Sequence, residues 1–136
     1  EKNCFITLTF NDHFVKPSLE KKDFQKFIKR LRKRIEPLKI KYYHCGEYGE
    51  QCGVCKKNRE NCTCTQFTYE RGRPHHHACI FGYDFEDKVY FKTQNGHKQF
   101  VSAELSELWT DPATKVLMGF STIGNVTFEI AAYVAR

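Results

Sequence analysis

Residues 74–82, PHHHACIFG, are the stretch from which the fold can be worked out. The segment is β-prone and is predicted to be a strand. Side chains two positions apart in a strand share a face, so His75 and His77 lie together, about 6–7 Å apart at the backbone. His76 then points to the opposite face with Ala78, where helices should pack. This strand is therefore predicted to supply half of a metal site on one face and part of the core on the other.

The segments around this strand predict a small sheet with helices. Three further strands are expected, at residues 5–10 (FITLTF), 39–47 (KIKYYHCGE) and 116–123. One helix should run from a cap at Ser18 to Pro37, and a second should span 100–110 with Ser102 as its cap. A last helix, capped by Asn125 or Thr127, should run to the end of the sequence. The order β-α-β-β-α-β plus a terminal helix predicts an α+β, ferredoxin-like fold, an antiparallel sheet with helices on one face.

The helix after Ser18 is predicted to be amphipathic. Its apolar residues recur at spacings of three and four, which places them on one buried face: they are Phe24, Phe27, Ile28, Leu31 and Ile35. Basic residues occupy the rest of its circumference. Either this arc is an ordinary solvated surface or it binds phosphates. The candidate DNA-binding residues are Lys26, Lys29, Arg30 and Lys33, together with Arg73 just before the histidine strand.

A divalent cation used for phosphoryl chemistry needs a hard oxygen ligand beside the two imidazoles. Glu47 is the first candidate, because it ends the strand that would pair with residues 74–82 in a hairpin. Glu50 and Glu70 are alternatives that the sequence leaves open. A pair of surface histidines with a turn carboxylate would give the same pattern without a metal.

The segment 49–72 is predicted to be a cysteine-rich insertion between the two metal-bearing strands. Its cysteines follow the pattern C-x2-C-x6-C-x-C, and they are Cys52, Cys55, Cys62 and Cys64. Four thiolates in so short a loop have the ligand count of a structural Zn²⁺ site, with no position left for a substrate. The clustering fits a metal better than a disulfide framework and favours a reducing cytosol.

Composition sets broad limits on the protein. The 136 residues fit one domain, spanning 1–136, with 40% hydrophobic residues, 28% charged residues and a net charge of +6. A basic balance favours a polyanionic partner, and no apolar run approaches the length of a membrane span. The sequence has no initiator methionine and stops abruptly at Arg136, so an excised domain is expected.

Tyr133 is the remaining candidate for chemistry. A tyrosine in an apolar helix is usually a core residue, because its hydroxyl is a poor nucleophile at its ordinary pKa near 10. A neighbouring metal ion or base can activate that hydroxyl for covalent catalysis.

Taken together, these motifs resemble the HUH endonuclease superfamily, in particular the replication initiators of the microviruses, which are small single-stranded DNA bacteriophages. Four pieces carry the resemblance in the expected order: residues 5–10, 44–50 (HCGEYGE), 72–78 (GRPHHHA) and 131–136 (AAYVAR). The chain departs from the family pattern at His76, where an apolar or aromatic residue is usual. Related phage initiators also carry a second tyrosine four residues after the first, a position that lies beyond Arg136.

The resemblance implies a mechanism. Mg²⁺ or Mn²⁺ held by His75, His77 and Glu47 would act on the scissile phosphate, and Tyr133 would form a 5′-phosphotyrosine while releasing a 3′ hydroxyl. The implied role is initiation of rolling-circle replication on single-stranded origin DNA. The implied setting is the cytoplasm of a host bacterium, with host replication proteins as further partners and no membrane.

Three other interpretations remain open at the level of sequence. An HUH transposase or relaxase would keep the chemistry and change the biology. A non-enzymatic, RRM-like module with a zinc loop would bind single strands by stacking on aromatics. A zinc hydrolase using His75 and His77 is a weaker possibility.

Overall fold

The computed structural model describes residues 2–16, 18–49 and 74–135, and in the last helix it describes side chains as far as Ala132. In these residues the chain forms one antiparallel sheet in the order β2-β3-β1-β6-β5-β4. The strands are β1 (Asn3–Thr9), β2 (Lys41–Tyr48), β3 (Pro74–Phe81), β4 (Val89–Gln94), β5 (His97–Val101) and β6 (Ser121–Gly124). The predicted α+β class with an antiparallel sheet is confirmed.

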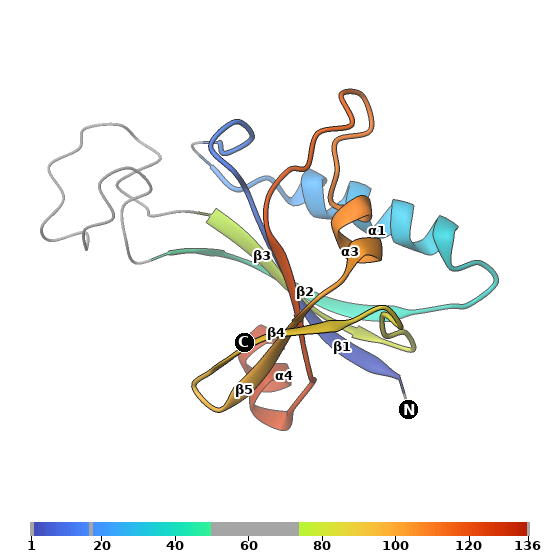
Figure 1. The fold of residues 1–136 in the computed structure, drawn as a ribbon, viewed down its shortest axis with the longest axis vertical. Helices are drawn as coiled ribbons and strands as arrows, with labels where there is room; N and C mark the ends of the chain where they lie inside the picture. Colours follow the sequence, from blue (N-terminus) through green and yellow to red (C-terminus); the bar gives the residue numbers. More distant parts are fainter. Residues whose placement is uncertain (1, 17, 50–73, 136) are drawn as a thin grey trace, which may run out of the picture.

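The helices cover both faces of this sheet (Figure 1). Helices α1 (Lys21–Arg34) and α3 (Ala103–Leu108) lie on the face that carries the main core, as predicted. Helix α4 (Phe128–Ala135) lies against β2 and β3 on the other face. The expectation of helices on one face therefore holds for α1 and α3 and not for the terminal helix.

The core between the sheet and α1 follows the predicted periodicities. Alternate residues of β1 are fully buried, and all five apolar residues predicted on the face of α1 are buried with them. Trp109 joins this core, and its indole N–H donates to the backbone oxygen of Thr9 at 2.6 Å. The core thus fixes β1, the strand at the centre of the sheet beside β3.

Two of the predicted helix caps are present and one is wrong. The Ser102 hydroxyl accepts the Leu105 N–H at 3.0 Å, and the Thr127 hydroxyl accepts the Ile130 N–H at 3.1 Å. Helix α1 instead begins after Glu20, without a side-chain cap, so Ser18 is not its N-cap. The first turn of α1 carries Asp23, whose charge favours a helix N-terminus.

The hairpin β4–β5 is absent from the sequence-based prediction. Asn95 and Gly96 connect its strands with φ of 53° and 80°, the backbone of a tight turn that favours Asn-Gly. Because β5 extends to Val101, the second helix is shorter than the predicted 100–110. The strand predicted at 116–123 is also shorter, since β6 begins at Ser121.

The predicted zinc-binding insertion lies outside the described residues, apart from Gly49. The three other cysteines were expected to be small buried residues. Cys4 and Cys79 are fully buried and Cys45 is partly buried, and all three are free thiols.

Candidate metal centre

The β2–β3 hairpin brings Glu47 and the two histidines together. Glu47 is the cross-strand partner of His75, and Cys45 is the partner of His77. Directly opposed residues share a face, and so do residues two apart in a strand. The three side chains therefore converge on the sheet face opposite α1.

The ligand atoms of these three side chains lie close enough to share one ion. Nε2 of His75 is 3.7 Å from one carboxylate oxygen of Glu47, and Nε2 of His77 is 3.9 Å from the other. Among the described residues, this is the group of three potential ligands whose atoms all lie within 4.8 Å of one another. Two atoms that bind one ion at about 2.1 Å can be at most about 4.2 Å apart, so both measured pairs satisfy the limit. Two imidazoles and a carboxylate suit a first-row divalent ion.

Thr7 on β1 orients one of the imidazoles. Its hydroxyl oxygen lies 2.9 Å from Nδ1 of His77, and the two residues are cross-strand partners. A hydrogen bond at Nδ1 favours the tautomer that leaves the Nε2 lone pair directed toward Glu47. Phe5 stacks on the same imidazole, with ring centroids 5.3 Å apart. The sequence reasoning missed both contacts, because strand threonines and phenylalanines are common without such a role.

The electrostatic surroundings keep His77 neutral. Burial, followed by the neighbouring His75 and His44, lowers the pKa of His77 to about 4. A neutral imidazole can donate a lone pair to a metal at physiological pH, whereas a protonated one cannot.

His76, between the two ligand candidates, faces the core as predicted. It is fully buried, and its Nδ1 shares a hydrogen bond of 2.8 Å with Nε2 of His44. The His44 ring stacks on Phe24 of α1 at 4.0 Å between centroids. Burial lowers the pKa of His76 to about 3 and that of His44 to about 4. The polar residue at this position is thus accommodated as a neutral pair under α1.

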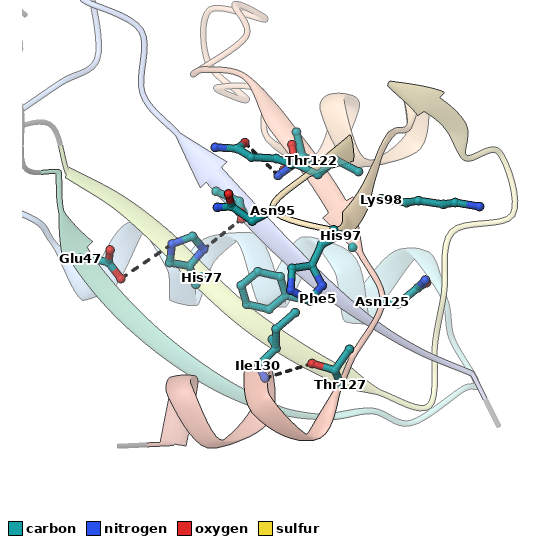
Figure 2. Close-up of a pocket in the computed structure, with 15 residues that line it drawn as sticks. Phe5, Glu47, His77, Asn95, His97, Lys98, Thr122, Asn125, Thr127 and Ile130 are labelled. Atoms are coloured by element: carbon teal, nitrogen blue, oxygen red, sulfur yellow. Dashed lines mark hydrogen bonds and ion pairs between the residues drawn. The ribbon is translucent and has the colours of Figure 1, made fainter. Parts of the chain in front are cut away.

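A groove of about 920 Å³ runs from the metal centre to the β4–β5 turn. Figure 2 shows Glu47 and His77 at one end, with Ile130 projecting from α4 toward Phe5. The turn side of the groove is lined by Gln94, Asn95, Gly96, His97, Lys98 and Gln99. These residues were not predicted to belong to the site, although the Asn-Gly pair is a hairpin signal that the sequence does contain.

The predicted nucleophile lies on α4. Tyr133 is in the second half of this helix, which packs against β2 and β3, the strands that carry Glu47 and the histidines. The side chain of Tyr133 lies outside the described part of the chain.

The predicted DNA-binding residues of α1 lie on the other face of the sheet. Lys26, Lys29 and Lys33 are exposed there. Arg30 is half-buried, and its Nε donates to the Leu108 backbone oxygen of α3 at 2.9 Å. The structure therefore gives Arg30 a contact within the protein, while the three lysines face solvent away from the metal centre.

Several other predicted site residues lie outside the described ranges. These are Arg73, the alternative ligands Glu50 and Glu70, and the cysteines 52, 55, 62 and 64. In the part of the chain that is described, no helix is both long and apolar enough to cross a membrane.

Comparison with known proteins bears on this geometry. Residues 3–59, which include β1, α1 and β2, match the family model of the ORF2-type replication-associated proteins. The chain is 33% identical to the replication-associated protein ORF2 of Spiroplasma virus 4, over 98% of this chain and 37% of that protein. It is 30% identical to the replication-associated protein VP4 of Bdellovibrio phage phiMH2K, over 100% and 38% of the two chains.

A third relative is the replication-associated protein ORF4 of Chlamydia phage 1, 28% identical over 100% of this chain and 31% of that protein. The chain thus spans about a third of the length of these relatives, and no solved structure gives a significant match. Because the matches run across nearly the whole chain and all carry the same description, the chain belongs with the replication-associated proteins of small single-stranded DNA phages.

Proposed function

We propose that this chain is the nicking and rejoining domain of a rolling-circle replication initiator acting on single-stranded origin DNA. The observation that carries the proposal is the grouping of Glu47, His75 and His77 on one face of the sheet, with both histidine–carboxylate pairs under 4 Å. The replication-associated relatives support replication over a transposase or relaxase role.

The residues have distinct parts in the proposed reaction. Glu47, His75 and His77 hold the cation, and Thr7 keeps His77 in the binding tautomer. When bound, Mg²⁺ or Mn²⁺ would polarise the scissile phosphate and stabilise its developing charge. The Tyr133 oxygen forms a bond to phosphorus as the bond from phosphorus to O3′ breaks. The phenol loses its proton, and the departing O3′ gains one to become the 3′ hydroxyl that primes synthesis.

Rejoining is the reverse transfer. A 3′ hydroxyl attacks the phosphotyrosine, restores a phosphodiester and returns the tyrosine. The packing of α4 on β2 and β3 supports this assignment, because it carries Tyr133 on an element that lies against both ligand-bearing strands. The adjacent groove offers the single strand a path away from the centre.

Two further parts of the proposal concern the rest of the chain. Cys52, Cys55, Cys62 and Cys64 would hold a structural Zn²⁺ within the insertion. Lys26, Lys29 and Lys33, with Arg73, would bind backbone phosphates outside the metal centre, since the three lysines lie on the opposite face of the sheet.

A covalent-adduct assay tests the proposal. The purified protein is incubated with Mn²⁺ and a tiled set of single-stranded oligonucleotides from the genome that encodes it, and denaturing gels report protein-linked DNA. The Tyr133→Phe variant should bind the reactive oligonucleotide and form no adduct. Tyr43→Phe, which alters an exposed tyrosine of β2, is the matched control and should react normally.

A non-enzymatic single-strand-binding module is the second candidate, favoured by the exposed aromatic residues of the sheet. The same assay separates the two. Tight binding of single strands with no adduct on any oligonucleotide, with either Mn²⁺ or Mg²⁺, supports the binding module.

A further inference from the structure

An exposed apolar surface lies at the β4 end of the sheet. Phe91 of β4 and Phe120, just before β6, are 45% and 51% exposed, and their ring centroids are 5.3 Å apart. We call these two rings the aromatic pair. The other exposed apolar residues nearby in the sequence are Val89, Tyr90, Val116 and Leu117. Exposed aromatic clusters of this kind indicate a binding surface.

The aromatic pair lies on the same face as the metal centre. Ser121 and Ile123 are buried in the core, whereas Thr122 between them lines the groove. Phe120, two positions before Thr122, therefore faces the groove side, and the Phe91 ring contacts it there. The backbone oxygen of Phe120 accepts the N–H of Thr9, and Thr9 is the cross-strand partner of His75. Since neighbouring strands are about 4.8 Å apart, the backbone at Phe120 lies about 10 Å from that at His75.

Phe120 is held in place. Its backbone oxygen accepts hydrogen bonds from both the N–H and the hydroxyl of Thr9, at 3.0 and 2.7 Å. The preceding Gly119 passes so close to Thr9 that an added Cβ would lie 2.0 Å from its backbone oxygen. The ring is thus presented by a fixed backbone, which lowers the entropy cost of stacking a ligand against it.

The charges near the pair favour an anionic partner. Lys92 lies over the Phe91 ring at 5.5 Å, and Lys88 lies over the Phe100 ring at 5.1 Å. The sequence between residues 89 and 102 contains no aspartate or glutamate. Aromatic faces flanked by cations are the common device for binding single strands, because every base can stack and every phosphate is negative.

We infer that the aromatic pair is a stacking platform for bases of the single strand that also occupies the metal centre. This inference rests on the proposed function and adds to it a second contact region on the same sheet face. The platform would hold bases a few nucleotides from the scissile phosphate and extend the bound length of DNA beyond the groove.

The test compares oligonucleotides of two lengths by fluorescence anisotropy. The probes are an oligo-dT of about 6 nucleotides and one of about 20 nucleotides, and the variant is the double substitution Phe91→Leu, Phe120→Leu, which keeps apolar volume and removes stacking. The variant should bind the longer probe about tenfold more weakly and the shorter probe unchanged. The double substitution Phe91→Tyr, Phe120→Tyr should retain affinity, because stacking is preserved.

The matched controls are Phe128→Leu and Leu38→Ala, which alter residues that are 91% and 55% exposed elsewhere. Equal affinity of the Leu double variant and the wild type for the longer probe would overturn the inference. So would unchanged affinity accompanied by loss of a dimer in solution, because the pair would then be a contact between copies of this chain. Adduct formation is scored separately: a length-dependent affinity loss in a protein that forms no adduct retains the platform and refutes the nuclease.

Discussion

At the scale of the residue, the metal centre depends on a hydroxyl that is not itself a ligand. Thr7 contacts Nδ1 of His77 at 2.9 Å and belongs to the central strand β1, which is anchored in the core. Glu47 and the histidines could be predicted from spacing and hairpin register. Thr7 could not, because its role appears only when β1 and β3 are paired.

Replacing Thr7 by valine should weaken metal binding. Loss of the hydroxyl leaves the tautomer and ring orientation of His77 undetermined, and such changes typically lower metal affinity about 10- to 100-fold. Calorimetric titration with Mn²⁺ measures the effect. Thr122→Val is the matched control, since Thr122 lines the same groove. Equal Mn²⁺ affinity in Thr7→Val and wild type would show that Thr7 does not orient the ligand.

The buried histidines should make the metal-free protein sensitive to acid. The pKa of His76 in the fold is about 3, below the value of 6.5 expected when it is unfolded. The unfolded chain therefore binds a proton at pH values where the folded chain does not. The free energy of unfolding should fall by about 1.4 kcal/mol per pH unit for this group as pH drops from about 6.5 toward 3.

His76→Leu should make that dependence shallower by about the same amount between about pH 6 and pH 4. Urea unfolding in the presence of a chelator measures it at each pH. His13→Leu, on an exposed loop, is the control and should leave the slope as in the wild type. A His76→Leu slope as steep as that of the wild type would contradict the burial of a neutral imidazole.

At the scale of the element, the predictions succeeded where a segment has one buried face. The spacing in α1 and the alternation in β1 and β3 follow from burial on one side, so the pattern is visible in the sequence. Strand β4 has no such pattern, because all six of its residues are exposed at the edge of the sheet. The hairpin was therefore missed, and with it one wall of the groove.

The helix caps give a direct comparison between a correct and a wrong prediction. Ser102 is buried, accepts the Leu105 N–H and donates to Asp87, so Ser102→Ala should lower the free energy of unfolding by about 1–2 kcal/mol. Ser18 is exposed and caps nothing, so Ser18→Ala should change it by less than about 0.5 kcal/mol. Chemical denaturation of both variants checks this, and equal effects would contradict the assigned helix starts.

The lysines of α1 should contribute to affinity and not to chemistry. Changing Lys26, Lys29 and Lys33 together to alanine should reduce the salt dependence of single-strand binding, with a slope lower by about 2, or about 0.7 per lost phosphate contact. The rate of adduct formation at saturating DNA should stay unchanged, because α1 lies on the face away from the metal centre. Unchanged salt dependence would show that this basic arc is only a solvated surface.

At the scale of the whole molecule, the sheet separates structure from chemistry. One face carries the core and the neutral His44–His76 pair under α1. The other carries the metal centre, the groove and the aromatic pair, with α4 against β2 and β3. The ferredoxin-like order predicted this division for β3, since consecutive histidines must alternate between faces. The sequence alone could not place α4 on the site face, because its apolar residues fit either side.

The central claim is that Tyr133 becomes linked to DNA at the centre formed by Glu47, His75 and His77. Mass spectrometry of the Mn²⁺-dependent adduct, after nuclease trimming and proteolysis, measures this most directly. The account predicts a nucleotide attached through its 5′ phosphate to the peptide that contains Tyr133, and no such product from His75→Ala. A nucleotide on another residue, or the same product in undiminished yield from His75→Ala, would contradict it.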